Sequence, residues 1–389
     1  MLKVVVLSIS FLLLSAIAIN GILPEIRDAL EITQTQSELL VTIPSIATLI
    51  FVTLSNGLIN RFGMKKVVIA GLIIAGCGGM MPVFYAESYR YLLAGRFLLG
   101  AGKGLIFTSS ISYINLLFDE KERATLIGYR SAIEMLGQSL LTLGLGALAV
   151  ISWNFSFIIH GIYFLVAIAV AIWIPVVESE ATSEKVKNEE KMPVIIYPLA
   201  LLIGIVVISS SMIGIRFPAM VTEIMGETYN SSVLVATKPI LGIVAAVFFG
   251  KLHRLLGKKL FYMGMICLIS AQLLVGFSNG SFTLLVLGFL LSSFVMGWII
   301  PIVISIVSKV TVAGPKQRKA MSYILICANV GVFLMPFVAQ GLEVVLGNPA
   351  LTAPYPVMAG LVIVIFLFLV TFSNNKNFRK RVGLSYEKA

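Results

Sequence analysis

Residues 56–67 read NGLINRFGMKKV and residues 250–260 read GKLHRLLGKKL, so one polar motif occurs twice in the chain. Three pairs align at an offset of roughly 194 residues, namely Leu58 with Leu252, Gly63 with Gly257 and Lys65 with Lys259. Outside the motif the matches continue at nearly the same offset, with Pro24 on Pro218, Gly21 on Gly214, Pro44 on Pro239 and Arg123 on Arg318. The second half of the chain therefore repeats the first.

The composition points to a membrane as the main solvent. The chain has 389 residues, of which 58% are hydrophobic and 12% are charged. Soluble domains carry about 25% charged residues. Apolar segments of about 20 residues, each long enough to cross a hydrocarbon core as a helix, recur throughout. We predict twelve such helices, near residues 4–24, 37–59, 67–86, 91–116, 124–149, 154–177, 194–217, 231–250, 259–278, 282–308, 320–341 and 355–373.

The twelve segments form two sets of six, separated by the polar stretch ESEATSEKVKNEEKMP at 178–193. We therefore predict an all-α membrane protein whose twelve transmembrane helices form two pseudo-symmetric six-helix bundles. The bundles span residues 1–177 and 194–373, joined by a cytoplasmic linker at 178–193 and followed by a cytoplasmic tail at 374–389. Thr35 and Glu38 have the spacing of a capping box at the start of the second helix.

The net charge of +11 follows the predicted topology. Lysine and arginine residues concentrate in every second loop between the predicted helices. Examples are Lys65, Arg123, Lys187, Lys259 and Arg318. This alternation obeys the positive-inside rule and predicts a multi-pass protein of the cytoplasmic membrane with both termini in the cytoplasm. It argues against a nucleic-acid partner. Because all three cysteines lie inside predicted helices, we expect no disulfide, metal or cofactor.

Two motifs resemble those of the major facilitator superfamily. The first motif matches the family pattern G-x-L-a-D-R-x-G-R-K through Leu58, Arg61, Gly63 and Lys65. Residues 95–104, GRFLLGAGKG, are similar to the pattern R-x-x-Q-G-x-G. With the duplication and the topology, the resemblance covers the whole chain. It implies a secondary transporter that rocks two bundles about a central site.

The sequence departs from the family patterns at positions that bear on proton-coupled drug export. Asn60 replaces the usual Asp, Leu99 replaces the usual Gln, and the fifth helix lacks the Gly-Pro pair typical of proton-coupled drug exporters. Gly63 permits a tight turn, and the cations beside it meet helix dipoles or lipid phosphates. We expect a conformational switch made of Asn60, Arg61, Gly63, Lys65, Arg123, Gly257 and Lys258.

Several charges lie inside predicted helices, where each is costly and needs a partner or water. The candidate residues for binding substrate or protons are Arg96, Lys103, Glu134, Lys238, Arg130, Asn20 and Arg216. For Arg96, Lys103 and Lys238 the alternative is a cation that only stabilises packing. For Arg216 the leading interpretation is a side chain that snorkels to the outer surface. Asn20 could line the cavity or bond a neighbouring helix.

Glu134 is the one acid that we place deep in a helix, about 15 Å from the cytoplasmic side by rise per residue, with Arg130 one turn below. We predict that it carries protons, which requires a carboxyl that titrates as access alternates. The alternative is a structural pair with Arg130 that never titrates.

Cations outnumber acids within the helices, which favours an anionic or amphipathic solute. By resemblance we expect a monomeric, proton-coupled exporter of drugs or metabolites, surrounded by membrane lipids. One alternative is uptake or exchange of a small organic anion, because residues 39–51, LLVTIPSIATLIF, resemble the cyanate-permease-like branch of the superfamily. A lipid flippase is a more remote alternative. The sequence has no filter-type repeat of the kind that would indicate a channel, and no nucleophile–base set of the kind that would indicate an enzyme.

Overall fold

The computed structural model describes residues 1–176, 192–226, 228–257, 259–311 and 315–373. These residues form helices and no strand. Eleven helices are long and apolar enough to cross a membrane, and a bent pair at the start makes a twelfth if it is one span. The predicted all-α fold with twelve spans is confirmed. The predicted tail, Lys258 and all but the last two residues of the predicted linker lie outside the described residues.

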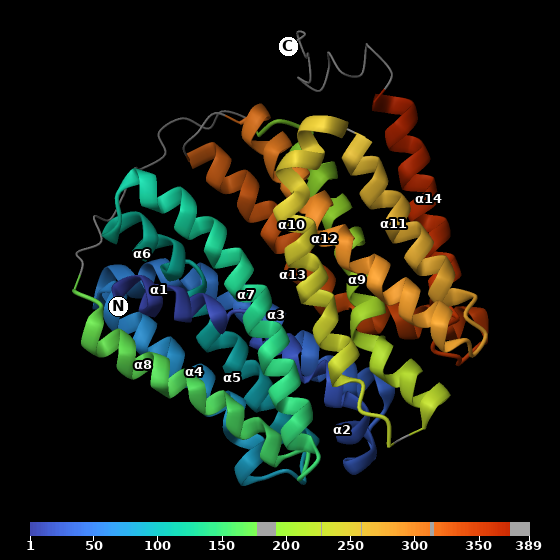
Figure 1. Cartoon of the computed structure of the whole chain (residues 1–389), viewed down its shortest axis with the longest axis horizontal. Coiled ribbons are helices and arrows are strands. Elements are labelled where there is room, and N and C mark those ends of the chain that lie inside the picture. Colours follow the sequence, from blue (N-terminus) through green and yellow to red (C-terminus); the bar gives the residue numbers. More distant parts are fainter. Residues whose placement is uncertain (177–191, 227, 258, 312–314, 374–389) are drawn as a thin grey trace. The chain divides into compact units, whose positions relative to one another are not determined.

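The elements follow the chain in this order (Figure 1): α1 (Leu2–Phe11), the 3₁₀ helix η1 (Ser15–Ile22), α2 (Leu23–Ala29), α3 (Gln34–Phe62), α4 (Met64–Phe84), α5 (Tyr89–Phe107), α6 (Ser109–Leu117), α7 (Glu120–Ala149), the 3₁₀ helix η2 (Phe155–Gly161), α8 (Ile162–Trp173), α9 (Ile196–Met225), α10 (Ser232–Leu256), α11 (Lys259–Gly276), α12 (Phe282–Val310), α13 (Pro315–Leu346) and α14 (Pro354–Ser373).

The chain divides into two compact units. Unit 1 comprises Met1–Thr182 and Ile215–Ile240, and unit 2 comprises Ser183–Gly214 and Leu241–Ala389. Helices α9 and α10 therefore contribute to both: the parts that adjoin the loop between them belong to unit 1, and the remainders belong to unit 2. The bundle boundaries at 177 and 194 stay a prediction.

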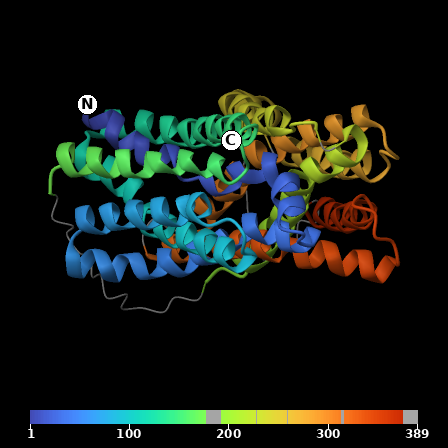
Figure 2. The same ribbon diagram turned by 90° about the horizontal axis from the view of Figure 1, so that it is seen from below.

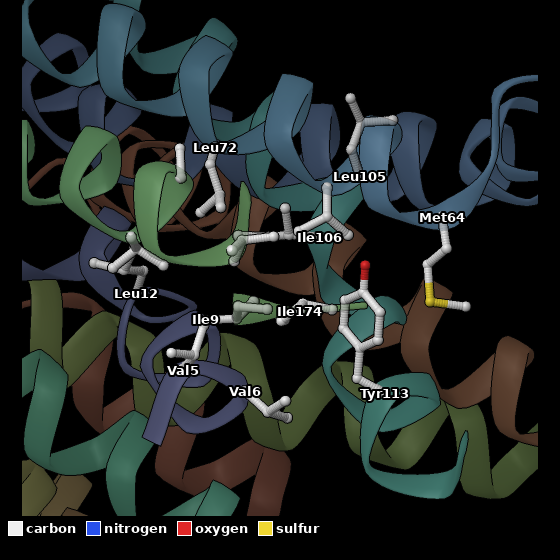
Figure 3. Close-up of a cluster of buried hydrophobic side chains, with 14 of the residues drawn as sticks. Val5, Val6, Ile9, Leu12, Met64, Leu72, Leu105, Ile106, Tyr113 and Ile174 are labelled. Atoms are coloured by element: carbon white, nitrogen blue, oxygen red, sulfur yellow. The ribbon is translucent and has the colours of Figure 1, made fainter. Parts of the chain in front are cut away.

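In unit 1, α5 packs closely on both α3 and α4. Viewed from below, α1, α7 and α8 lie in one layer and α4 and α5 in another (Figure 2). Apolar side chains from both layers fill the space between them, and Figure 3 shows Ile9, Leu72, Ile106 and Tyr113 among them. This cluster fixes the helices that carry the charged side chains described below.

The first span is broken, which the sequence did not lead us to expect for residues 4–24. Helix α1 ends at Phe11, and η1 begins at Ser15 after a bend of 48°. Side chains from distant helices bind the carbonyls at the break: the Tyr163 hydroxyl donates to Leu12 O at 3.0 Å, and Arg96 donates to Ala16 O. Leu12 O also accepts from Ser15 N at 3.1 Å, so the two side chains add tertiary bonds on either side of the bend and help to hold it in place.

The capping box at the start of α3 also differs from the prediction. It consists of Thr33 and Gln36, which exchange bonds of 3.2 and 2.9 Å with each other's backbone amides. The predicted pair Thr35 and Glu38 lies two residues further along, where Glu38 is already fully buried. Gly63 links α3 to α4 at a φ of 83°, so the predicted tight turn is present.

Unit 2 has its own core. Apolar side chains from α9, α11, α12, α13 and α14 form it, with Val206, Leu268, Val303 and Ile324 among them. Two side chains bond the backbone of α9 within this unit: Gln272 donates to Ser209 O at 2.8 Å, and Tyr355 donates to Met212 O at 3.1 Å. These bonds anchor the unit 2 part of α9.

Substituting Gly100 by alanine is expected to destabilise the fold. A Cβ at this position would lie 2.6 Å from Pro44 Cα and 2.9 Å from Ala47 Cβ, because α5 contacts α3 closely here. Overpacking of this kind costs about 1–3 kcal/mol. The measurement is the apparent melting temperature of the purified protein in detergent. Gly57→Ala is the matched control, since no atom lies within 4 Å of its Cβ position; equal melting of the two variants would contradict the packing argument.

Candidate functional site

All seven predicted binding residues lie in unit 1. They are Asn20 in η1, Arg96 and Lys103 on α5, Arg130 and Glu134 on α7, Arg216 on α9 and Lys238 on α10. Within the described residues, no group of three or more His, Cys, Asp or Glu side chains could hold a metal ion.

Lys103, Arg130 and Glu134 form one group, which we name the Glu134 cluster. Arg130 Nη2 lies 2.7 Å from Glu134 Oε1, and these two side chains are 11% and 17% exposed. Lys103 is buried on α5 and is attracted electrostatically to Glu134. The cluster therefore contains two cations and one acid.

Neighbouring residues position this cluster. Arg130 donates from Nε to Ser110 Oγ at 2.8 Å, and its guanidinium lies 5.9 Å from the centre of the Phe107 ring. One turn beyond Glu134, Gly137 brings α7 against the backbone of Phe11, at the break in the first span. Lys103 lies between Gly102 and Gly104, which let α5 approach α4 and α3. The cluster thus lies among closely packed helices.

Arg96 lies on the same helix as Lys103 but has different surroundings. Its side chain is fully buried and donates from Nε to Leu40 O at 2.8 Å and from Nη2 to Ala16 O. These two bonds connect α5 to α3 and to η1. They are the contacts expected of a packing cation, the alternative that the sequence left open.

Glu38 is a buried acid that our sequence interpretation did not include among the candidates. Its Oε1 lies 2.8 Å from Arg216 Nε, and both side chains have 0% exposure. Arg216 therefore does not snorkel to the surface, which corrects the leading interpretation of that residue. A signal was present in the sequence: at the repeat offset, Glu38 aligns near Val233 and Arg216 near Ile22, so neither charge has a charged counterpart.

Lys238 lies on the part of α10 that belongs to unit 1, where α10 runs antiparallel to α7. Ser139 donates to Ala236 O at 3.0 Å, and Asn230 donates to Gly146 O at 2.9 Å. From this register, Lys238 and Glu134 differ in height along α7 by about 5 Å. A lysine side chain can span such a distance, so Lys238 lies near the level of the Glu134 cluster.

Among the predicted switch residues, Asn60, Arg61, Gly63, Lys65 and Gly257 lie around the two matching turns, Arg123 lies near the start of α7, and Lys258 is outside the described residues. Arg61 lies over the ring of Phe62 at 5.3 Å, and Arg123 donates to Phe118 O at 2.7 Å. Gly63 and Gly257 both have positive φ, at 83° and 52°. Asn60 is exposed near the end of α3, and Lys65 follows in α4. Their role as a switch stays a prediction.

The family model of the Major Facilitator Superfamily matches residues 5–269 and 199–385. The chain therefore belongs to this superfamily, and it is a multi-pass membrane transporter and not an enzyme. It is 34% identical to the bacillibactin exporter of Bacillus subtilis (strain 168) over 112 residues, which cover 27% of this chain and 28% of that protein. It is 23% identical to the quinolone resistance protein NorB of Staphylococcus aureus (strain JH9) over 219 residues. That match covers 56% of this chain and 47% of NorB, so the alignments span less than half of either relative.

Solved structures show the same fold. A mutant of the nucleoside transporter NupG matches with a TM-score of 0.75 and 12% identity over 95% of this chain and 99% of that chain. The inward open xylose transporter XylE from E. coli matches with a TM-score of 0.72 and 15% identity, covering 99% of each chain. At such low identity these likenesses concern the fold alone.

Proposed function

We propose that this transporter exports a small organic solute across the cytoplasmic membrane in exchange for protons, by alternating access of the bundles 1–177 and 194–373 with both termini in the cytoplasm. The observation that carries the proposal is the Glu134 cluster, a mostly buried acid held between two cations inside the membrane span. The two relatives described above support export, because their names record an exporter and a resistance protein.

The cluster suggests how coupling would work. Ionised Glu134 neutralises one of the two cations, and protonation would leave both charges uncompensated. In an exchanger, a solute that donates hydrogen bonds or carries positive charge competes with the proton for the carboxylate. Proton entry at Glu134 therefore displaces the solute, and the two move in opposite directions.

The cationic surplus favours a second candidate function, the uptake or exchange of a small organic anion. If protonation releases Lys103 and Arg130 from Glu134, an anion binds best to the protonated cluster. Proton and anion then move in the same direction. The two functions therefore predict opposite signs of coupling from the same three residues.

Substituting Glu134 by glutamine is expected to abolish flux driven by a pH gradient, because the amide cannot carry a proton. The measurement is solute movement in proteoliposomes with an imposed gradient, across cationic drugs and organic anions. Glu120→Gln on the same helix is the control, since Glu120 is exposed in the first turn of α7 and should leave the flux unchanged. Flux of an anion in the direction of the protons would overturn export, and intact coupling in Glu134→Gln would remove Glu134 as the carrier.

A further inference from the structure

The Glu38–Arg216 ion pair lies in a polar network that continues to the surface. Gln34 donates from Nε2 to Glu38 Oε1 at 2.8 Å, and Arg27 donates from Nη1 to Gln34 Oε1 at 3.2 Å. Arg27 also pairs with Asp28, at 2.9 Å, where both side chains reach solvent. A chain of polar groups thus connects the fully buried carboxylate of Glu38 with the outside of the bundle.

The ion pair joins the two sequence repeats within unit 1. Glu38 lies on α3 of the first repeat, and Arg216 lies on α9 of the second, one residue after α9 enters unit 1 at Ile215. Three hydrogen bonds between the repeats use neutral groups: Ser231 donates to Gly21 O, Asn230 to Gly146 O and Ser139 to Ala236 O. Among these contacts, Glu38–Arg216 is therefore the one that a proton could break directly.

We infer that Glu38 is a proton-sensitive gate residue, whose protonation releases Arg216 and opens the outer end of the transporter. This inference rests on the proposed alternating-access function, in which the two repeats separate at this end. Glu38 takes one proton from the water that reaches Arg27 and Asp28, and the neutral carboxyl no longer attracts the Arg216 guanidinium. When the outer end closes again, Glu38 returns that proton to the same water and the ion pair forms.

Charged groups on the neighbouring helices set the field at Glu38. Arg216 faces it from α9, and Arg27 lies beyond Gln34 on α2. Glu223, on α9, interacts electrostatically with Arg27, as Glu25 does with Asp28 on α2. Since the closed state holds the carboxylate in its ionised form, acid is expected to favour the open state.

The test measures opening by the labelling of Ser231→Cys with a membrane-impermeant maleimide. Ser231 is buried and bonded to Gly21 in the closed state, so its thiol reacts only when this end opens. The native Cys77, Cys267 and Cys327 are first replaced by serine. Rates are divided by those of Glu87→Cys, an exposed site, because maleimide chemistry itself depends on pH. Lowering the pH from about 7 to about 4 should raise the normalised rate about threefold, because a carboxyl freed from its ion pair takes up a proton only in the ordinary glutamate range.

Glu38→Gln should label fast at every pH, whereas Glu38→Asp should keep the pH response. Glu31→Gln, in the exposed turn before α3, is the control and should behave as the parent protein does. If Glu38→Gln does not fold, the double variant Glu38→Gln/Arg216→Gln should also label fast without a pH response. A normal pH response in a folded Glu38→Gln or double variant, or slow labelling at every pH, would overturn the inference.

Labelling needs no solute, so the two proposals fail separately. Glu134→Gln should leave the pH response of labelling intact while abolishing gradient-driven flux. Intact flux coupling together with pH-independent labelling of the parent protein would reject only the role of Glu38. A pH response of labelling without gradient-driven flux would reject only the proposed function.

Discussion

Arg96→Gln should lower the stability of the protein, whereas Lys103→Gln should leave the fold intact and reduce transport. Arg96 is bonded to two backbone carbonyls on separate elements, Leu40 O and Ala16 O. A hydrogen bond from a charged group contributes about 1.5–3 kcal/mol, so the loss of both costs about 3 kcal/mol or more. Glutamine is too short to reach both carbonyls. The measurement is thermal unfolding in detergent, with transport assayed on the folded fraction.

Lys103 provides the contrast because it lies two turns further along the same helix, in the Glu134 cluster. The Lys103→Gln change removes one of the two cations that attract the Glu134 carboxylate. A loss of attraction worth one pKa unit changes the protonation equilibrium of Glu134 tenfold, so transport should fall about tenfold or more. Arg96→Lys tests the geometry, since one ammonium cannot reproduce the two-pronged guanidinium contact. A stable Arg96→Gln protein with defective transport would show that Arg96 acts in the cavity.

The presence of the membrane helices could be predicted from the sequence, because a long apolar segment is a strong signal of a membrane span. Each of the twelve predicted segments has a counterpart among the helices, counting the bent pair as one. The turn at Gly63 was also predictable, because a glycine with positive φ is the simplest way to end α3 and begin α4 within one residue. These features depend on local residues alone.

The break in the first span could not be predicted locally. Residues 12–14 are all leucine, so the sequence contains no proline or glycine at the bend. Tyr163 from α8 and Arg96 from α5 donate to the carbonyls of Leu12 and Ala16, and Leu12 O also accepts from Ser15 N. Only the folded arrangement of distant helices shows these bonds. The same contacts account for the burial of Arg96, whose motif position suggested a role in the cavity.

The buried acid at Glu38 was missed for a different reason. Thr33–Gln36 and Thr35–Glu38 both have capping-box spacing, and a helix start is uncertain by one or two residues from sequence. Assigning Glu38 to the helix cap implied that its side chain is exposed. In the structure the Glu38 carboxylate is buried, where it contacts Gln34 on the same helix and the distant Arg216. Comparison of the two repeats identifies it as unmatched, so broken symmetry is the more reliable signal.

Replacing Glu38 by leucine or Arg216 by methionine should cost about 3–5 kcal/mol each, because either change leaves an uncompensated charge in the core. The double variant Glu38→Leu/Arg216→Met should recover most of this loss, since two apolar side chains need no desolvation. It will not recover all of it, because Gln34 loses its acceptor on Glu38. The free energy of unfolding of the four proteins, measured in one detergent, gives the coupling energy of the pair.

The exposed pair Lys3–Glu122 is the matched control for this cycle. Its atoms are as close, at 2.6 Å, but its side chains are 52% and 44% exposed. Water screens such a pair, so the same cycle with Lys3→Met and Glu122→Leu should give a coupling energy of about 0–1 kcal/mol. Equal coupling energies for the two pairs would mean that burial does not strengthen Glu38–Arg216. Opening at this end would then need no proton, because solvent alone could separate the charges.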